Sequence, residues 1–441
     1  MTLTDAPATN TSGSTADVVD EIRAWLADNW DPELTVGEWW ERLGTSGWSA
    51  PTLPIGRYGK GLSRSDAVKV SNEIQKFGAL GAPGGLGLLL AAPTIADHGT
   101  DEQVETYVRD IVTGKQAWCQ LFSEPGAGSD LAGLSTKGMK DGDEWIFNGQ
   151  KVWTSTGSIA DMGMLIARTN VDVPKHSGIT WFAIDMHQPG MDVRPLYEMT
   201  GHAMFNEVFI SDARTPDSAV IGGLNNGWAV ANTTLSHERS GLGAGGGGGG
   251  FGAQPGTVVN QLGKRAGDFA PKNDGSPSRR SSPAQRGSMQ AQFAKGNGKN
   301  EDPIIRQQLA KLHTITELGR MNNERLKAYR AGGKDIPGMA NISKLMMSDM
   351  VRLQRDLGLS ILGAHGMLHA YNDEQKKVND EATKNPFIGM ITGTALYAQA
   401  PPIYGGTDQI QRNIIGERVL GLPKEPNDDK TKTFAQLPKN A

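Results

Sequence analysis

The sequence contains a single cysteine, Cys119, among its 441 residues. One cysteine excludes an intrachain disulfide framework, and it excludes any zinc or iron–sulfur site built from several cysteines. The eight histidines include no HExxH motif, the signature of one class of helical zinc site. The chemistry of this protein must therefore come from other residues or from a bound organic group.

The chain also lacks a long apolar run and a strong excess of charge. Its longest apolar stretch, around Leu86 to Pro93, is far below the ~18–20 residues of a membrane-spanning helix. A net charge of −4, from 44 basic and 48 acidic residues, excludes a nucleic-acid binder that works through a whole-chain basic field. The N-terminus shows no basic region followed by an apolar core, so we predict no secretory signal. We expect a cytoplasmic globular protein with no membrane span and no nucleic-acid partner.

Hydrophobic periodicity divides the chain into helical, strand-rich and again helical regions. Val18, Ile22 and Leu26 recur at helical spacing, and Thr35 is a candidate cap for the helix that follows it. Short runs such as EWIFNGQKVWTS and ITWFAIDM are typical of strands, with turn signals at Asp141-Gly142 and Asn148-Gly149. The predicted fold is α+β and multidomain: a flexible tail (1–15), an N-terminal helical domain (16–116), a middle β sandwich or barrel (117–230), a C-terminal helical domain (231–423) and a C-terminal tail (424–441).

Long helices are predicted over 303–332, 340–371, 384–399 and 407–420. Two segments interrupt this C-terminal region. Residues 241–256 are glycine-rich, with six consecutive glycines at 245–250, and residues 263–302 are polar and rich in Ser, Gly and Pro. The second segment is predicted to be a mobile surface loop. A phosphate-binding role for its arginines is the less favoured alternative, and it would fall on Arg279, Arg280 or Arg286.

Three short motifs combine small, hydroxyl and aromatic residues in ways that suit a ligand. They are WCQLFSEPGAGSDLAG from Trp118, NGQKVWTSTG from Asn148 and YGGTDQIQRNIIGERVLGLP from Tyr404. Each motif alone has an ordinary structural explanation: a strand-to-loop turn, a core tryptophan or a helix cap. In this order, and with this domain sequence, they resemble the acyl-CoA dehydrogenase family closely over roughly residues 16–423.

The resemblance implies a flavoprotein that binds FAD and oxidises an acyl-CoA thioester to the trans-2-enoyl-CoA, passing electrons to an electron-transferring flavoprotein. It places the cofactor against Ser123, Trp153, Ser155, Thr407 and Gln409, and the substrate against Ser129, Arg239 and Tyr404. The backbone N–H of Gly405 would donate to the thioester carbonyl.

The sequence departs from the usual family pattern at the catalytic base. Most members have a glutamate where this chain has Gly405, whereas a long-chain and isovaleryl-type branch takes its base from an ER pair on another helix. Here that pair is Glu238-Arg239, so the resemblance implies that Glu238 is the base. Burial beside flavin and acyl chain should then raise its pKa. Glycines 241, 243 and 245–250 would leave room for a long, branched or ring-bearing acyl group, or they form a linker with no role in the pocket.

Two family segments that bind the FAD of a neighbouring subunit are incomplete in this chain. The RxxFG segment is missing, and the QxxGGxG segment keeps only Gly363 and Gly366. An active homotetramer, a dimer of dimers built on the C-terminal helices, is the leading expectation. A partner subunit of a heterotetramer that completes another chain's FAD site, and an acyl-CoA oxidase, are the alternatives.

Overall fold

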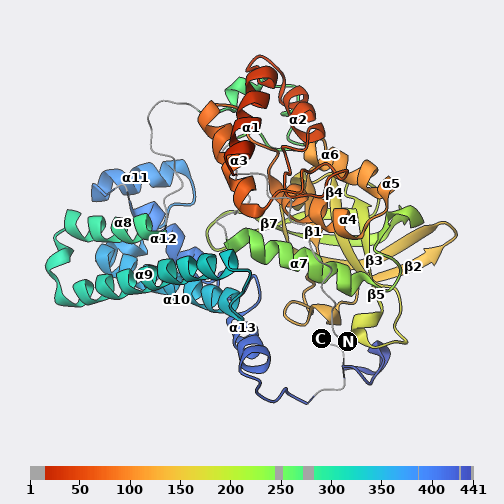
Figure 1. The fold of residues 1–441 in the computed structure, drawn as a ribbon. Coiled ribbons are helices and arrows are strands. Elements are labelled where there is room, and N and C mark those ends of the chain that lie inside the picture. The colour runs from red at the N-terminus through yellow and green to blue at the C-terminus, as the bar shows by residue number, and fades with distance from the viewer. Residues whose placement is uncertain (1–14, 244–251, 272–282, 386, 427–428, 439–441) are drawn as a thin grey trace.

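The computed structural model describes the chain except for residues 1–14, 244–251, 272–282, 386, 427–428 and 439–441. Figure 1 shows three parts: N-terminal helices in red and orange, a central sheet in yellow and green, and a C-terminal helical bundle in green and blue. This arrangement confirms the predicted order of helical, β and helical regions. Of the predicted flexible tail (1–15), residues 1–14 lie outside the described residues and Thr15 begins the first helix; the six consecutive glycines also lie outside the described residues. In the part of the chain that the structure describes, no helix is long and apolar enough to cross a membrane.

The N-terminal part packs its helices around tryptophans. Trp39 and Trp40 are fully buried, and their indole N–H groups donate to the carbonyls of Leu80 and Gly81. Thr35 caps the second helix as predicted, because its hydroxyl accepts from the N–H of Glu38 at 3.2 Å. The helices are α1 (Thr15–Asn29), α2 (Val36–Thr45), α3 (Arg64–Phe77), α4 (Ala92–His98), α5 (Asp101–Gln103) and α6 (Arg109–Val112).

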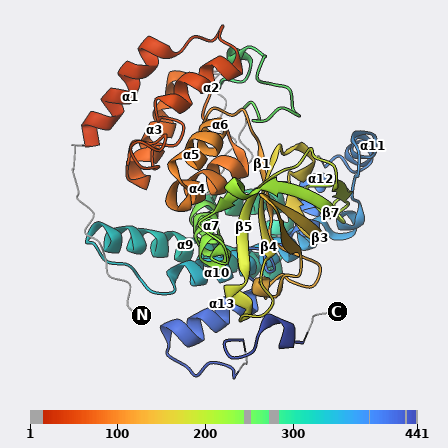
Figure 2. The same ribbon diagram turned by 90° about the vertical axis from the view of Figure 1, so that its right-hand side faces the viewer.

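The β domain forms a curled sheet of mostly antiparallel strands (Figure 2), ordered β6-β7-β3-β2-β4-β5-β8 with β1 parallel to β4. The strands are β1 (Trp118–Leu121), β2 (Lys137–Asp141), β3 (Glu144–Ser155), β4 (Met162–Arg168), β5 (Ile179–Asp185), β6 (Met191–Leu196), β7 (Phe205–Pro216) and β8 (Val220–Ile221). Asp141-Gly142 makes the β2–β3 turn as predicted.

Side chains of the sheet alternate between two cores. In β4, Met164 and Ile166 pack against the helices, whereas Leu165 and Ala167 enter an inner core shared with β1, β3, β5 and β7. This period of two follows from strand geometry. Strands far apart in the sheet order thus line one inner core, which agrees with the predicted sandwich or barrel.

The predicted turn at Asn148-Gly149 is wrong, because both residues lie inside β3. The strand has a register shift between Phe147 and Asn148 at this point. A Cβ on Gly149 would lie 2.4 Å from Thr136 Oγ1, so the glycine serves a close approach of two strands rather than a turn.

The C-terminal part begins with α7 (Gly227–Gly243), which packs against β5 and α4, and continues as a separate bundle (Figure 1). The bundle helices are α8 (Pro283–Gly296), α9 (Pro303–Ala331), α10 (Met339–Leu362), α11 (Asp373–Thr383), α12 (Ile388–Tyr397) and α13 (Asp408–Ile414). The helix predicted over 340–371 ends early, because the chain turns at Gly363 with a φ of +58°.

The prediction of a mobile surface loop over 263–302 is wrong where the chain forms a helix, and residues 263–271 form a loop that is held by hydrogen bonds. Residues 283–296 form α8, which packs against α9. Residues 252–271 run along the N-terminal helices, where the carbonyls of Leu262 and Lys264 accept hydrogen bonds from Gly37 and Val36 at 2.8 Å. Ala253 and Ala266 complete the tryptophan core there. A polar sequence is therefore ordered by backbone pairing with a distant segment.

Candidate active site

The end of β1 and a bulge in β3 bring the first two motifs together. The N–H of Val152 donates to the carbonyl of Ser123 at 2.9 Å. The next residue, Trp153, has a φ of +60° and lies at the register shift between Lys151 and Thr154. Its side chain is 57% exposed, and its ring meets Phe205 edge-on at 5.8 Å between centroids. A large, exposed aromatic side chain with an unusual backbone conformation makes Trp153 a candidate contact for a ligand.

A buried ion pair lies directly behind this surface. Lys151 is wholly buried, and its Nζ lies 2.9 Å from Glu124 Oε1 and donates to the carbonyl of Phe122 at 3.0 Å. The Glu124 carboxylate also accepts from the N–H groups of Ser135 and Thr136 at 2.6 and 2.9 Å. Burial acts to raise the pKa of Glu124, but Lys151 and these N–H donors outweigh it and hold that pKa below its usual value. The pair fixes the residues on both sides of Ser123.

Glu238 lies on α7, beside the middle of β1. Burial raises the pKa of Glu238, and the amide of Gln120 and the cation of Arg239 offset this rise only in part. Gln120 belongs to β1 and stands three residues before Ser123, and its buried amide is the group that acts on the Glu238 carboxylate. A half-buried carboxylate with a raised pKa therefore stands beside the amide of Gln120, which is itself close in the chain to the Ser123 turn.

The third motif forms the entry to α13 in the bundle. Gly405 and Gly406 both have positive φ, +63° and +82°, a conformation that favours glycine. Their carbonyls accept from Gln411 Nε2 at 2.9 and 3.4 Å, and the hydroxyl of Thr407 caps α13. The hydroxyl of Tyr404 lies 3.0 Å from that of Tyr397.

Asp408 anchors this turn to α10. Its buried carboxylate accepts from Lys344 Nζ at 2.9 Å and from the Ser348 hydroxyl at 2.7 Å through one oxygen. Its other oxygen accepts from Arg352 at 2.8 Å. Burial acts to raise the pKa of Asp408, but Ser348, Lys344 and Arg352 together hold it below its usual value.

The predicted site residues thus fall into three groups. Ser123 and Trp153 are joined by the hydrogen bond from Val152, and the half-buried Ser155 ends the same strand. Glu238 and the exposed Arg239 lie on α7. Ser129 is exposed on the loop after β1, and the third motif lies in the bundle, with Gln409 exposed. Among the described residues, no hydrogen bond or ion pair joins the third motif to the first two groups.

Sequence reasoning missed Lys151, Gln120 and the partners of Asp408. The signal for Lys151 was present, since alternation from Trp145 and Phe147 places it on the inward side of β3. A lysine at an inward strand position needs a buried anion. The partners of Asp408 gave no such signal, because they lie on another helix about 60 residues away.

His365 and His369 stand four residues apart, a spacing that binds metals on helices. Here the segment is a 3₁₀ turn from Gly363 to Met367, and the ring of His369 bonds Thr392 and the carbonyl of Thr200. Within the described ranges, no group of three His, Cys, Asp or Glu side chains is placed to hold a metal ion.

The residues around the β3 bulge fit a flat conjugated ring. The exposed indole of Trp153 offers a stacking partner, and the hydroxyls of Ser123 and Ser155 offer donors at the rim of such a ring. Ser123 stands two residues after β1, and Trp153 and Ser155 lie in β3; Lys151 and Glu124 hold these segments from behind. This donor set and its rigid support suit FAD.

Comparison with known proteins agrees with this geometry. Residues 13–115 match the acyl-CoA dehydrogenase N-terminal domain, residues 119–213 the middle domain and residues 290–420 the C-terminal domain. The chain is 31% identical over 424 residues to acyl-CoA dehydrogenase IpdE1 of Mycobacterium tuberculosis, covering 92% of this chain and 97% of that protein.

Two further likenesses cover most of the chain. It is 33% identical over 386 residues to acyl-CoA dehydrogenase FadE34 of the same organism, covering 87% of this chain but only 46% of that protein, so the chain spans about half of its length. The solved structure of the Tcur3481-Tcur3483 steroid ACAD is 26% identical, with a TM-score of 0.66 over 93% of this chain and 98% of that one. The chain belongs to the acyl-CoA dehydrogenase family, whose members are FAD flavoproteins that oxidise acyl-CoA thioesters.

Proposed function

We propose that this protein converts an acyl-CoA to the trans-2-enoyl-CoA with Glu238 as the catalytic base. The observation that carries the proposal is the burial of Glu238 near Gln120, on the strand that leads to Ser123 and the Trp153 bulge. An α-proton of a thioester is too weakly acidic for an exposed carboxylate with a pKa of about 4.3. Burial raises the pKa of Glu238 and so brings the base closer to the acid that it must deprotonate.

Ser123, Trp153 and Ser155 would hold the FAD ring, and Thr407 and Gln409 would contact the same cofactor. When bound, FAD supplies the acceptor for the hydride from the β-carbon. Trp153 would cover the ring and exclude water from it, while the Ser123 and Ser155 hydroxyls would orient its edge. Ser129, Arg239 and Tyr404 would line the acyl-CoA path.

Gly405 would donate its N–H to the thioester carbonyl, where negative charge develops as the α-proton leaves. The hydrogen bond from Gln411 to the Gly405 carbonyl fixes the peptide that follows Gly405, and the positive φ of Gly405 sets the angle between that peptide and the preceding one, which carries the N–H. A glycine at this position also leaves space for a carboxylate that arrives from α7. These features support the branch of the family in which the base stands on a different helix.

The acyl group is proposed to be long, branched or ring-bearing. The glycines at 241 and 243 end α7 one turn after Glu238 and offer no side chain to fill a pocket. The likeness to a protein named as a steroid ACAD supports the same choice. An electron-transferring flavoprotein is the proposed electron acceptor. Fast turnover with oxygen alone and release of hydrogen peroxide would instead indicate an oxidase.

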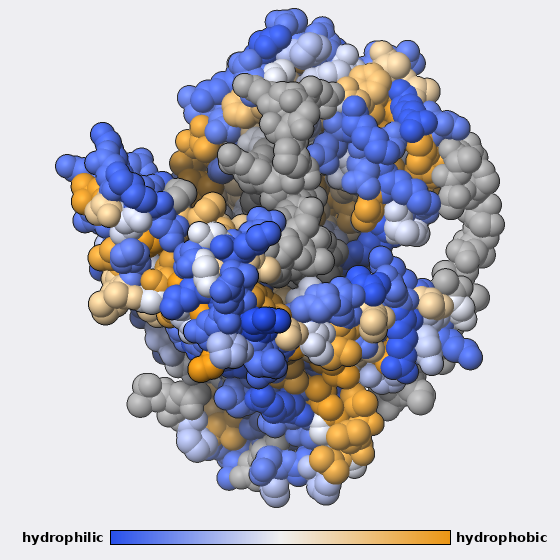
Figure 3. Space-filling model, turned by 90° about the vertical axis from the view of Figure 1, so that its left-hand side faces the viewer, coloured by the Kyte–Doolittle hydropathy of each residue, from blue (hydrophilic) through white to orange (hydrophobic). Residues whose placement is uncertain are grey.

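Assembly through the bundle is proposed to give a homotetramer. Large hydrophobic side chains of its helices are exposed, among them Leu318 and Met321 of α9 and Met390 of α12. Figure 3 shows hydrophobic residues gathered in patches on one face of the molecule. The incomplete segment around Gly363 and Gly366 favours a second candidate, a partner subunit of a heterotetramer. Stoichiometric FAD in a homogeneous preparation supports the homomeric enzyme, and absence of flavin supports the partner subunit.

The test of the base is Glu238→Gln. The variant should keep FAD and acyl-CoA binding but lose flavin reduction by substrate, by about 10²–10⁴-fold, the contribution of a positioned general base. Stopped-flow absorbance of the flavin measures this rate directly. The wild-type rate should fall as pH falls through the raised pKa of Glu238, because only the ionised carboxylate accepts the proton. This acid limb should be missing from the variant.

Two controls sharpen this experiment. Glu374→Gln changes an exposed carboxylate on α11 and should leave the rate unchanged. Adding Gly405→Glu to Glu238→Gln places a carboxylate at the other family position and should restore part of the activity. A wild-type rate of flavin reduction in Glu238→Gln would show that another residue is the base.

A further inference from the structure

The C-terminal segment, defined here as residues 429–438, returns from the bundle and lies on the β domain (Figure 1). The N–H of Phe434 donates to the carbonyl of Val173 at 2.8 Å, and that of Ala435 to Val171 at 3.0 Å. These two hydrogen bonds attach the segment to the loop between β4 and β5. The contact orders a stretch that the sequence describes only as a tail.

A buried lysine connects this segment to the loop that carries Ser129. Lys175 is only 7% exposed, and its Nζ lies 2.9 and 3.0 Å from the two carboxylate oxygens of Asp130. The same Nζ lies 2.7 Å from Asp429 of the C-terminal segment. Asp130 directly follows Ser129, the residue proposed to contact the acyl-CoA arm. One ammonium group therefore ties the C-terminal segment to the neighbour of Ser129.

A second buried cation makes a parallel connection. Arg168 is 3% exposed and donates to the carbonyl of Ala132 at 2.6 Å and to that of Lys175. The ring of Phe434 lies 3.8 Å from the guanidinium carbon, a cation–π contact that covers Arg168 from the solvent side. The C-terminal segment thus holds the 129–134 stretch at two points, at Asp130 through Lys175 and at Ala132 through Arg168.

The segment does not belong to the hydrophobic core. No residue of the segment is a member of the clusters of buried apolar residues found in the described chain. A cavity of about 320 Å³ lies between the segment, the loop after β1 and strand β3, and Phe434, Leu437 and Pro438 form one wall of it. Changes in this segment should therefore leave the core intact, because the segment spans a hollow rather than filling it.

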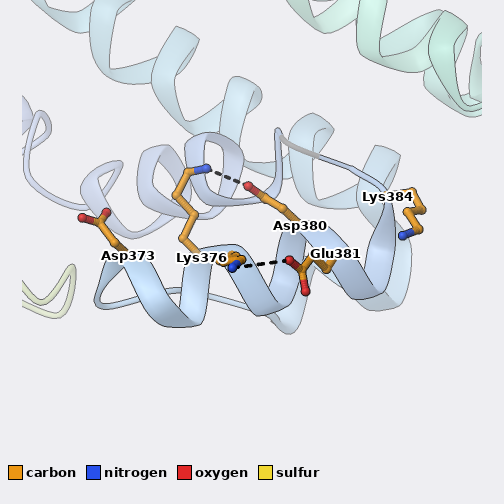
Figure 4. Close-up of a pocket in the computed structure, with 6 residues that line it drawn as sticks. Asp373, Lys376, Asp380, Glu381 and Lys384 are labelled. Carbon is orange, nitrogen blue, oxygen red and sulfur yellow. Dashed lines mark hydrogen bonds and ion pairs between the residues drawn. The ribbon is translucent and has the colours of Figure 1, made fainter.

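Another hollow of the molecule offers no comparable arrangement. It runs along α11 and is lined by Asp373, Lys376, Lys377, Asp380, Glu381 and Lys384. Figure 4 shows Lys376 and Asp380 paired, and a second pair, Lys377 with Glu381, stands one residue further along the same helix. These are ordinary exposed pairs at helical spacing.

We propose that the C-terminal segment is a positioning element of the acyl-CoA site, acting through Lys175 and Arg168 on the Ser129 loop. The inference rests on the proposed function of Ser129. Asp429 and Phe434 touch neither substrate nor cofactor in this proposal; they fix the loop that does. A loop held at two points binds its ligand with less loss of conformational freedom, so the segment lowers KM rather than raising kcat.

The test is the double variant Asp429→Asn/Phe434→Ala in the full-length holoenzyme. KM for acyl-CoA should rise by roughly tenfold, the loss of about one charge-assisted contact, while kcat and FAD content stay near wild type. Phe434→Tyr keeps the ring over Arg168 and should retain the wild-type KM. Glu425→Gln removes the same charge as Asp429→Asn from an exposed residue just before the segment, and it should change nothing.

Hydrogen exchange of the backbone amides provides a readout that does not depend on activity. In the double variant, residues 129–136 should exchange faster, while β4 and β5 keep their protection. An unchanged KM in an active enzyme, or unchanged exchange in this loop, overturns the proposal. A loss of FAD and thermal stability in proportion to the loss of activity also overturns it, because the segment would then only support the fold. A wild-type protein that no acyl-CoA reduces would contradict the proposed function instead.

Discussion

Two buried carboxylates, Glu124 and Asp408, hold the motif loops at Ser123 and at Gly405. Their own ion-pair partners differ in number and in exposure. Glu124 follows Ser123 in the β domain and bonds one cation, Lys151, which is itself wholly buried. Asp408 follows Thr407 in the bundle and has two cations, Lys344 and Arg352, whose side chains are 12% and 38% exposed. Both carboxylates therefore stay ionised, with pKa values held below the usual range.

The difference lies in what remains when one partner is lost. Around Glu124, removal of Lys151 leaves a buried negative charge that is hydrogen-bonded by the N–H groups of Ser135 and Thr136, while Arg168 acts on it through charge alone. Around Asp408, removal of either cation leaves the other and the Ser348 hydroxyl. The β-domain loop should thus depend on a single side chain, while the bundle loop should tolerate single changes.

The largest effect is expected from Lys151→Met. This change should lower the free energy of unfolding by about 3–5 kcal/mol, the usual cost of breaking a buried ion pair by removing one partner. FAD content should also fall, because the bond from Lys151 to the carbonyl of Phe122 holds the turn beside Trp153. Urea unfolding and the flavin-to-protein absorbance ratio measure the two effects.

Two variants test the cause of this loss. Lys137→Met removes an exposed lysine from the neighbouring strand β2 and should cost little. Adding Glu124→Gln to Lys151→Met removes the unpaired charge and should recover part of the stability. If Lys151→Met unfolds at the same urea concentration as wild type, the buried pair does not hold the Ser123 loop, and this loop does not depend on a single side chain.

The motif loops at Ser123 and at Gly405 can be predicted from the sequence, but the buried ion pairs that hold them cannot. Ser123, Trp153 and the Tyr404 motif are visible because their residue types and order are distinctive. The order of helical and β regions follows from periodicity, which is a local property of the chain. Lys151 pairs with a residue 27 positions away and Ser348 with one 60 positions away, and a single sequence carries no record of such pairs.

Contacts between distant residues also explain why composition gave the wrong prediction for two polar segments. Residues 252–271 have no hydrophobic period, yet they are ordered by backbone hydrogen bonds to residues 32–37. The C-terminal segment is ordered by Arg168 and Lys175, which no local pattern connects to it. Polar composition indicates only that a segment cannot form a core of its own; it does not exclude docking on a surface formed elsewhere.

A smaller effect is expected from Lys344→Met in the bundle. Asp408 loses a charge-assisted bond of 2.9 Å but keeps Arg352 and Ser348, so the free energy of unfolding should fall by roughly 1.5–3 kcal/mol. Combining this change with Asp408→Asn in a double-mutant cycle isolates the pairwise contribution. A loss as large as that of Lys151→Met would mean that two cations provide no redundancy.

The smallest effect is expected from Arg352→Gln. Its guanidinium is 38% exposed and is shared between Asp408 at 2.8 Å and Asp349 at 3.3 Å. Pairs open to solvent typically contribute about 0–1 kcal/mol, and we expect a loss within that range. The difference from wild type should also shrink between low salt and 0.5 M salt, since mobile ions screen exposed charges over a distance of about 10 Å already at 0.1 M. The effect of Lys344→Met should change less with salt, because that ammonium is largely shielded from water. If the two variants showed the same loss and the same salt dependence, exposure would not decide how strongly each cation supports the Gly405 turn.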